Sequence, residues 1–206
     1  MLHEMMGMAP LPIMLCDQRK LTPSFGYVFD PRWLDLHDSL LSILWKFIKM
    51  NSVSGHLIVM QLAKTDVDPY EGIAVCKFEI DMQRLHVDLG LSLKVIRESI
   101  TPNLLGNATC PNFRFCRRCL NRGYHGTAYQ FESVIRCPLH GDILETRCRS
   151  CGMSTAYHLN VSILNSPFRC KYCSNLYGTN TPNFIHKSTF KRISRRAITR
   201  TRILRC

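Results

Sequence analysis

The sequence predicts an α+β fold that is mostly α, because helical periodicity fills its first half and paired cysteines fill its second half. Basic residues gather toward the C-terminus. We therefore expect an N-terminal arm at 1–28 and a helix-turn-helix-like helical domain at 29–109. Two tandem metal-binding ribbons at 110–180 and a basic tail at 181–206 follow. The 206 residues suffice for one larger domain or two small ones.

The first predicted helix pair lies near the start of the helical domain. Apolar residues recur at helical spacing from 40 to 48, and Asp35 or Asp38 is placed to cap that helix, because a short carboxylate accepts from the free N–H groups of a first turn. The stretch NSVSG breaks the helix, and HLIVMQLAK predicts a second one over roughly 55–64. The turn-rich stretch TDVDPYEG ends this pair.

A second helix pair follows in DMQRLHVDLGLSLKVIRESI. The apolar positions are Leu85, Val87 and Leu89 in the first helix and Val95, Ile96 and Ile100 in the second. Gly90 is suited to a left-handed turn and Ser92 to a cap, which gives a helix-turn-helix pattern. The second helix carries Lys94, Arg97 and Glu98 within a segment of net negative charge. We therefore favour a packing or partner-protein surface here over direct DNA reading.

Four ligand pairs with two-residue spacing occupy the second half of the chain. They are Cys116 with Cys119, Cys137 with His140, Cys148 with Cys151, and Cys170 with Cys173. In order they read C-x2-C-x17-C-x2-H and then C-x2-C-x18-C-x2-C, an internal repeat of about 32 residues. The repeat assigns the first four ligands to one metal site and the last four to another.

The spacing of these pairs has a physical reason. Two intervening residues make a tight knuckle that turns both side chains toward one cation, and two knuckles complete a tetrahedron around Zn²⁺. Gly141 and Gly152 directly follow knuckles, where a positive φ is often needed. The histidine in the first set favours zinc, so we expect two structural zinc ions in two zinc ribbons, although a four-cysteine site also suits iron.

Each predicted set supplies four protein ligands and leaves no position for an activated water. Metal-dependent catalysis is therefore disfavoured, and we expect a protein that is not an enzyme. Cys76 is expected to be a buried apolar residue, and Cys110, five residues before the first knuckle, is the weaker alternative ligand. His125 and His158 have no knuckle partner and are expected on the surface or in hairpins.

The charge of the chain is divided unevenly. Residues 1–109 carry ten Lys/Arg against twelve Asp/Glu, residues 110–186 carry nine against three, and residues 187–206 carry eight against none. Nucleic acid is the natural partner of such an asymmetry, and a solvated tail is the alternative. The sequence contains no apolar run long enough to span a membrane. Its N-terminal stretch lacks the basic start of a signal peptide. We therefore expect a cytoplasmic protein with reduced thiols.

Basic residues in two places are candidates for contact with nucleic-acid phosphates. Around the first knuckle they are Arg114, Arg117, Arg118 and Arg122. In the tail they are Lys187, Lys191, Arg192, Arg195, Arg196, Arg200 and Arg202. Tail binding is expected to lack sequence preference and to weaken steeply with salt, and apolar tail residues are spaced so that a helix could form on contact.

The stretch FRFCRRCLNRGYHGTAYQFESVIRCPLHGDILETRCRSCG, residues 113–152, resembles the signature of the TniQ family. The matching features are an R-x-C-x-x-C opening, the Tyr129–Val134 region, C-P-x-H-G-x-x-L and C-x-x-C-G. The stretch DSLLSILWKFIKMNSVS resembles the N-terminal part of the family, so the resemblance spans roughly residues 23–178. Arg117 replaces the usual proline after the first knuckle cysteine, and residues from 179 onward have no counterpart.

The resemblance implies a helix-turn-helix domain joined to zinc ribbons and a role in DNA transposition. TniQ-like proteins recruit an AAA+ ATPase regulator of the TnsC type to target DNA, and some bridge that ATPase to an RNA-guided CRISPR effector. The chain lacks a long C-terminal DNA-reading region of the TnsD kind, so it is similar to the compact members. A transcription regulator with helix-turn-helix and zinc ribbons is the alternative function.

Overall fold

The computed structural model describes residues 27–100, 109–185 and 190–203, so almost all of the predicted arm at 1–28 lies outside the described residues. The fold combines short helices with one two-stranded antiparallel sheet. The helical elements are η2 Pro31–Trp33, α1 Leu40–Asn51, α2 Gly55–Leu62, α3 Met82–Leu89, α4 Leu93–Ser99, α5 Arg117–Asn121, η3 Thr127–Gln130, α6 Val161–Leu164 and α7 Arg192–Ile203. The strands are β1 Ile73–Ala74 and β2 His158–Leu159.

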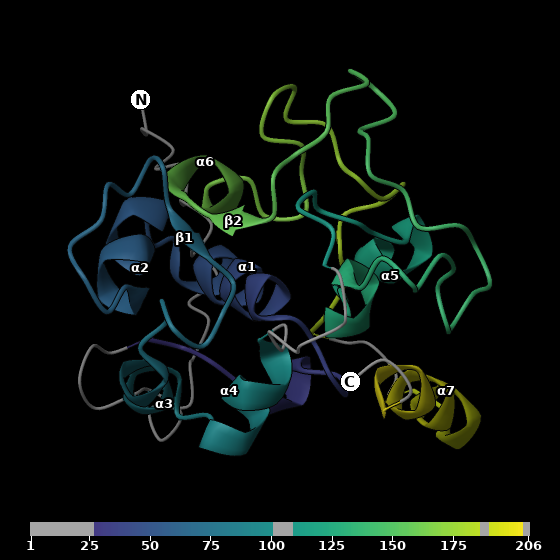
Figure 1. The fold of residues 1–206 in the computed structure, drawn as a ribbon, viewed down its shortest axis with the longest axis horizontal. Helices are drawn as coiled ribbons and strands as arrows, with labels where there is room; N and C mark the ends of the chain where they lie inside the picture. The colour runs from purple at the N-terminus through teal and green to yellow at the C-terminus, as the bar shows by residue number, and fades with distance from the viewer. Residues whose placement is uncertain (1–26, 101–108, 186–189, 204–206) are drawn as a thin grey trace, which may run out of the picture.

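The cysteine-rich loops lie on one side of the fold and α1 to α4 lie on the other (Figure 1). Helix α7 lies apart from α2 and α6, beyond α5 in the same view. Within the described ranges, no helix is both long enough and apolar enough to cross a membrane.

Helix α1 is the centre of the helical half, and its apolar residues are buried as their spacing predicts. Ser39 caps the helix, because its Oγ accepts a hydrogen bond of 3.2 Å from the N–H of Ser42. The prediction that Asp35 or Asp38 caps α1 is therefore wrong. The Asp38 carboxylate instead pairs with the buried ammonium group of Lys46, two turns into the helix.

Helix α2 begins at Gly55, close to the predicted start at 55. It packs against α6, and a Cβ atom added at Gly55 would lie 2.8 Å from the Cβ of Leu164. The side chain of Asn165 also accepts a hydrogen bond of 2.6 Å from the Gly55 N–H. Glycine is therefore required at this position by the close approach of two helices.

Helices α3 and α4 pack against each other across the predicted glycine turn. Gly90 has φ of 62°, and the Ser92 Oγ accepts from the Val95 N–H at 3.3 Å, as predicted. Leu85 and Leu89 are buried, but Val87 is 57% exposed. The prediction for Val87 is wrong because residues two apart lie on nearly opposite faces of a helix, whereas residues four apart share one.

The first half and the second half of the chain share one hydrophobic core. Strand β1 pairs with β2, and the Nε1 of Trp45 donates a hydrogen bond of 2.8 Å to the carbonyl of Ile163. The Trp45 ring also lies 5.5 Å from the Phe113 ring and 5.0 Å from the Phe168 ring, measured between centroids. The predicted boundary near residue 109 therefore does not divide two separate cores.

A second, smaller core lies around the first cysteine pairs. Its members include three predicted metal ligands, several aromatic residues and one residue of α7. They are Cys116, Cys119, Tyr124, Ala128, Tyr129, Phe131, Val134, Cys137, Leu144 and Ile198. The tail segment 192–203 is thus a helix. The sequence predicts that a helix could form here on contact, and the structure shows the helix packed on the chain itself through Ile198.

Candidate metal centres

The first cluster brings together the four ligands that the repeat assigns to one site. They are Cys116, Cys119, Cys137 and His140. The Nδ1 atom of His140 lies 3.3 Å from the Sγ of Cys116, 3.3 Å from that of Cys119 and 3.6 Å from that of Cys137. Ligands about 2.0–2.3 Å from a tetrahedral metal lie roughly 3.3–3.8 Å from one another. The four atoms therefore surround a position that one metal ion fits.

The second cluster holds the remaining four predicted ligands, which are Cys148, Cys151, Cys170 and Cys173. The Sγ atoms of Cys148 and Cys173 lie 3.7 Å apart, and those of Cys151 and Cys170 lie 3.6 Å apart. A disulfide would bring two sulfur atoms to about 2.05 Å, so these are four free thiols around a second metal position. The two predicted ligand sets are confirmed as spatial clusters.

Three of the four knuckles have the same backbone geometry. The residue after each second ligand has a positive φ, which is 72° at Gly141, 73° at Gly152 and 59° at Ser174. Its N–H donates a hydrogen bond of 2.8 Å to the carbonyl of the first ligand in every case. The expectation of positive φ at Gly141 and Gly152 is confirmed. Ser174 meets the same requirement with a side chain, which costs conformational energy.

An arginine precedes the first ligand of each of these knuckles. Its side chain donates a hydrogen bond to the carbonyl of the residue that follows the second ligand. The pairs are Arg136 with the carbonyl of Gly141 at 3.0 Å, Arg147 with that of Gly152 at 3.4 Å, and Arg169 with that of Ser174 at 2.9 Å. Sequence reasoning missed these residues. The motif R-C-x2-C/H-G/S, which occurs three times in the sequence, could have identified these arginines.

The first ligand pair is built differently, on a helix. Helix α5 starts directly after Cys116, and the Leu120 N–H donates to the Cys116 carbonyl at 3.0 Å. Cys119 lies within α5 and is completely buried. This helix replaces the left-handed residue of the other knuckles, so a glycine is not required after Cys119.

A tyrosine hydroxyl lies against the sulfur atoms of the first cluster. The Tyr129 Oη is 3.0 Å from the Sγ of Cys119 and 3.4 Å from that of Cys137. Burial raises the pKa of Tyr129 well above its ordinary value, and nearby thiols raise it further, so the hydroxyl keeps its proton. Tyr129 is thus able to donate a hydrogen bond to a metal-bound thiolate. Outer hydrogen bonds of this kind orient metal ligands.

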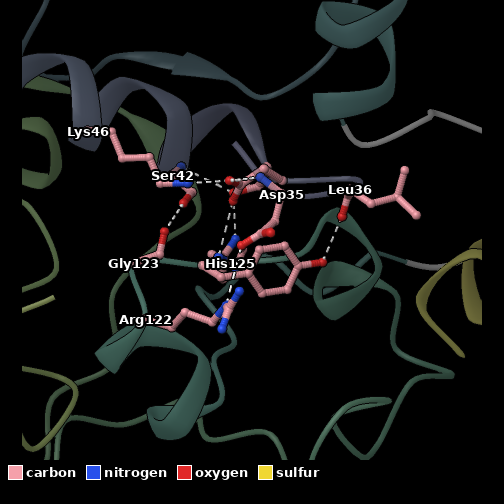
Figure 2. A network of polar contacts seen from close by, with 10 residues as sticks. Asp35, Leu36, Ser42, Lys46, Arg122, Gly123 and His125 are labelled. Carbon is pink, nitrogen blue, oxygen red and sulfur yellow. Dashed lines mark hydrogen bonds and ion pairs between the residues drawn. The ribbon is translucent and has the colours of Figure 1, made fainter. Parts of the chain in front are cut away.

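The start of α1 is joined to residues 122–125, which directly follow α5, through a buried polar network (Figure 2). The Ser42 Oγ donates to the Gly123 carbonyl at 3.2 Å, and the Ser39 N–H donates to the His125 carbonyl at 2.7 Å. At its edge, the Arg122 Nε lies 3.4 Å from the Asp35 carboxylate. Residues 122–125 lie only a few positions after Cys119, so the network fixes the helical half against the first metal centre.

His125 is a fully buried member of this network, with no exposed surface. Its Nδ1 lies 2.6 Å from the Ser39 Oγ and its Nε2 lies 2.8 Å from the Arg114 carbonyl. Burial lowers the pKa of His125 to about 4, against a smaller raising effect of the Arg114 carbonyl. The expectation of a surface histidine is wrong here, because the ring satisfies both nitrogens inside the protein.

Arg114 is not placed to contact a phosphate. Its side chain is buried, and its two terminal nitrogens donate to the Phe131 carbonyl at 2.7 Å and to the Val134 carbonyl at 2.6 Å. We correct its assignment to a structural one, because a buried guanidinium that ties two backbone carbonyls has no free donor face. The charge asymmetry alone did not distinguish it from the surface arginines.

The other arginines near the first knuckle lie at the surface. Arg117 and Arg118 line an open cleft of about 760 Å³ beside His140, together with Arg136 and Arg149. The Arg117 Nε donates to the Tyr177 carbonyl at 3.1 Å. Two acidic residues also line the cleft, so its charge is mixed with a basic excess.

Arg122 lies outside this cleft. Its guanidinium is 4.2 Å from the Phe190 ring centroid, just before α7, and its Nε faces the Asp35 carboxylate. Both interactions occupy the side chain within the protein, so Arg122 is better placed to hold segments of the chain together than to receive a phosphate.

The predicted tail residues divide into described and undescribed ones. Lys191, Arg192, Arg195, Arg196 and Arg200 are exposed. Lys187 and the side chain of Arg202 lie outside the described part of the chain, as do Cys16 and Cys206.

The remaining cysteines and histidines of the described ranges do not join either cluster. Cys76 and Cys110 are half-buried and line a separate pocket together with His158. The expectation of a buried Cys76 is therefore wrong, because the residue is only half-buried. His158 is exposed, as expected, because it lies on the short edge strand β2. Cys110 stays outside the first cluster, which already has four ligand atoms.

No family model matches the chain, and no curated protein matches its sequence.

Proposed function

We propose that both clusters hold structural zinc and that the chain is a non-enzymatic adaptor in DNA transposition. Three sulfurs and one imidazole nitrogen in the first cluster favour zinc over iron. The second cluster resembles the first in its sulfur separations, and its turns at Gly152 and Ser174 repeat the turn at Gly141. Each ion would have four protein ligands and no open position, which is the arrangement of a structural rather than a catalytic site.

One observation carries the adaptor proposal. The segment from Cys137 to Gly152, which gives the strongest resemblance to the TniQ family, folds as the joint between two four-ligand clusters. Cys137 and His140 complete the first cluster, and Cys148 and Cys151 begin the second. The resemblance therefore concerns residues with a structural reason for their spacing. In this proposal α3 and α4 form the helix-turn-helix-like unit of the family.

The adaptor would recruit an AAA+ ATPase regulator of the TnsC type to target DNA, and it could link that ATPase to an RNA-guided CRISPR effector. The basic cleft beside His140 and the exposed arginines of α7 support contact with DNA, because both present guanidinium groups to solvent. The net negative charge of residues 1–109 instead suits α3 and α4 to a protein partner.

Co-assembly tests this proposal directly. The chain would be mixed with an AAA+ ATPase of the TnsC type and a DNA duplex, with ATP or with ADP, and the complexes would be separated by size. We expect a ternary complex that requires ATP and contains all three components. Binding to a selected DNA sequence without any ATPase complex would overturn the adaptor and support the alternative transcription regulator.

Native mass spectrometry tests the metal assignment. We expect two zinc ions per chain, and Cys148→Ser should remove one of them. Iron in the second site, or a single ion in the intact chain, would contradict the proposal of two structural zinc ions.

A further inference from the structure

Helix α7 is held by apolar and stacking interactions on the first ribbon, which is the part of the chain around the cluster of Cys116, Cys119, Cys137 and His140. Ile198 is 2% exposed and belongs to the core that contains Cys116, Cys119 and Cys137. Just before the helix, the Phe190 ring meets the Tyr124 ring edge to face at 5.0 Å between centroids. The Arg122 guanidinium also lies over the Phe190 ring. The helix is therefore docked at a defined place and is not a loose appendage.

Four exposed arginines lie on one face of α7, with Thr199 among them. Arg192, Arg195, Arg196 and Arg200 are exposed, whereas Ile198 is buried. At about 100° per residue, the four arginines fall within an arc of roughly 140°, the centre of which lies about 130° around the helix from Ile198. The sequence contains no Asp or Glu after Glu145, so acidic neighbours along the chain do not neutralise this face.

We propose that this face of α7 binds the phosphate backbone of double-stranded DNA without sequence preference, and that the metal of the first cluster controls the binding while the second does not. The inference rests on the proposed function, which already gives the exposed arginines of α7 a contact with DNA, and it adds the class of nucleic acid and the control by one metal. It requires neither the ATPase nor an effector. Its failure therefore leaves the co-assembly result unaffected.

The chemistry of the face favours duplex DNA over other polyanions. Arginine forks match phosphate oxygens, and four of them along one helix follow a regular line of charge. No described residue of the exposed face is aromatic, whereas single-stranded nucleic acid is usually bound by stacking on aromatic rings. The buried apolar residue described in α7 faces the ribbon, whereas a helix at a membrane surface needs an apolar face for the lipid.

The dependence on one metal follows from the packing. Three ligands of the first cluster lie in the same small core as Ile198, and Tyr129 of that core contacts two of the ligand sulfurs. Removal of the first metal abolishes the ligand geometry that holds this core together, so α7 loses its docking surface. The second cluster instead contributes Cys148 and Cys170 to the other core. Removal of its metal leaves the α7 docking surface intact.

Fluorescence anisotropy with a labelled 20-base-pair duplex of arbitrary sequence, about two turns of DNA, tests the interaction. The variant Arg192→Ala/Arg196→Ala/Arg200→Ala should bind at least about tenfold more weakly. The slope of log affinity against log salt should become shallower by about one for each phosphate that the variant no longer neutralises. The control variant Lys64→Ala/Lys77→Ala/Lys94→Ala removes three exposed charges from the helical half and should bind like the intact chain.

Unchanged affinity in the arginine variant would overturn the proposal. A single strand of the same length that binds more tightly than the duplex, or vesicles containing phosphatidylserine that compete as well as the duplex does, would also overturn it. Each probe is used at the same salt concentration, because electrostatic affinities depend on it.

The metal dependence is tested with Cys137→Ser and Cys151→Ser, each checked by native mass spectrometry for the absence of one ion. Cys137→Ser should bind DNA as weakly as the triple arginine variant, and Cys151→Ser should bind like the intact chain. Ile198→Asp is the second variant, to be used if Cys137→Ser fails to fold. It keeps all eight ligands but places a carboxylate in the core that holds α7. It should therefore undock α7 and also weaken DNA binding. Equal weakening by the two cysteine variants, or none from Ile198→Asp, would overturn the metal-controlled docking.

Discussion

The two ribbons have similar ligand spacing but differ in what surrounds them. The first ribbon has a core of its own, in which three ligands, Tyr129 and α7 pack together. The second ribbon has two ligands within the main core, which also contains Phe168 and the centre of α1. Cys151 of the second cluster is exposed, whereas Cys119 of the first is completely buried. A repeated ligand spacing therefore does not imply equal contributions to stability, because different neighbours surround each cluster and would depend on a metal bound there.

The largest expected difference comes from removing one ligand of each ribbon. Cys119→Ser should destabilise the protein by about 5 kcal/mol or more, because the small first core depends on its metal for folding. Cys151→Ser should cost less, since α1 and Phe168 continue to hold the second ribbon. Urea unfolding followed by tryptophan fluorescence measures both. Equal destabilisation would show that the two ribbons depend on their metals to the same extent.

The next largest effect is expected in the buried polar network between α1 and residues 122–125. Lys46→Met should destabilise the protein by about 3–5 kcal/mol, because it leaves the Asp38 carboxylate buried without its cation. Lys49→Met, on the exposed face of the same helix, is the matched control and should change stability by less than about 0.5 kcal/mol. Similar values for the two variants would contradict the assignment of a buried ion pair.

The same buried polar network contains His125, which predicts a dependence of stability on pH. His125 has an unfolded pKa near 6.5 and a folded pKa of about 4, so the unfolded chain binds more protons between these values. The contribution of His125 to stability is therefore fully present above pH 6.5 and should fall by about 3 kcal/mol as the pH approaches 4.

The variant His125→Gln separates this effect from proton uptake by the metal ligands, which both proteins share. Urea unfolding at several pH values should give a smaller slope for the variant than for the intact chain. The same slope in both would show that His125 does not contribute to the decline of stability in acid.

The smallest expected effects compare equivalent turns of the two ribbons. Ser174→Gly should stabilise the protein by about 0.5–1 kcal/mol, because glycine adopts the positive φ of this knuckle without strain. Gly141→Ala and Gly152→Ala should each destabilise it by about 1 kcal/mol through backbone strain alone, since an added Cβ meets no atom within 4 Å at either position. Thermal unfolding with saturating zinc measures all three. A gain from either alanine variant would contradict the shared turn geometry.

The metal clusters could be predicted from the sequence because their information is local. Two-residue spacings and an internal repeat fix which ligands meet, and the turn residues Gly141 and Gly152 follow the same logic. Helix α1 and the turn at Gly90 were predictable for the same reason, since spacing and capping are short-range properties. Even there, the cap is Ser39, because Asp38 has a partner inside the protein.

The remaining features depend on interactions between distant residues. Nothing near Arg114 in the sequence indicates that its guanidinium would bind the carbonyls of Phe131 and Val134. The burial of His125 depends equally on Ser39, from the other half of the chain. The position of α7 requires the surface of the first ribbon, so its two faces could not be assigned before that surface was known.

The hydrogen bond from Trp45 to the carbonyl of Ile163 joins residues 118 positions apart. During synthesis α1 leaves the ribosome long before its partners in α6 and in the second cluster exist. Its apolar face therefore stays partly uncovered until α6 and Phe168 have been synthesised, which exposes the nascent chain to aggregation. Expression in cells with ample zinc and with chaperones that cover nascent hydrophobic segments should accordingly raise the yield of folded protein.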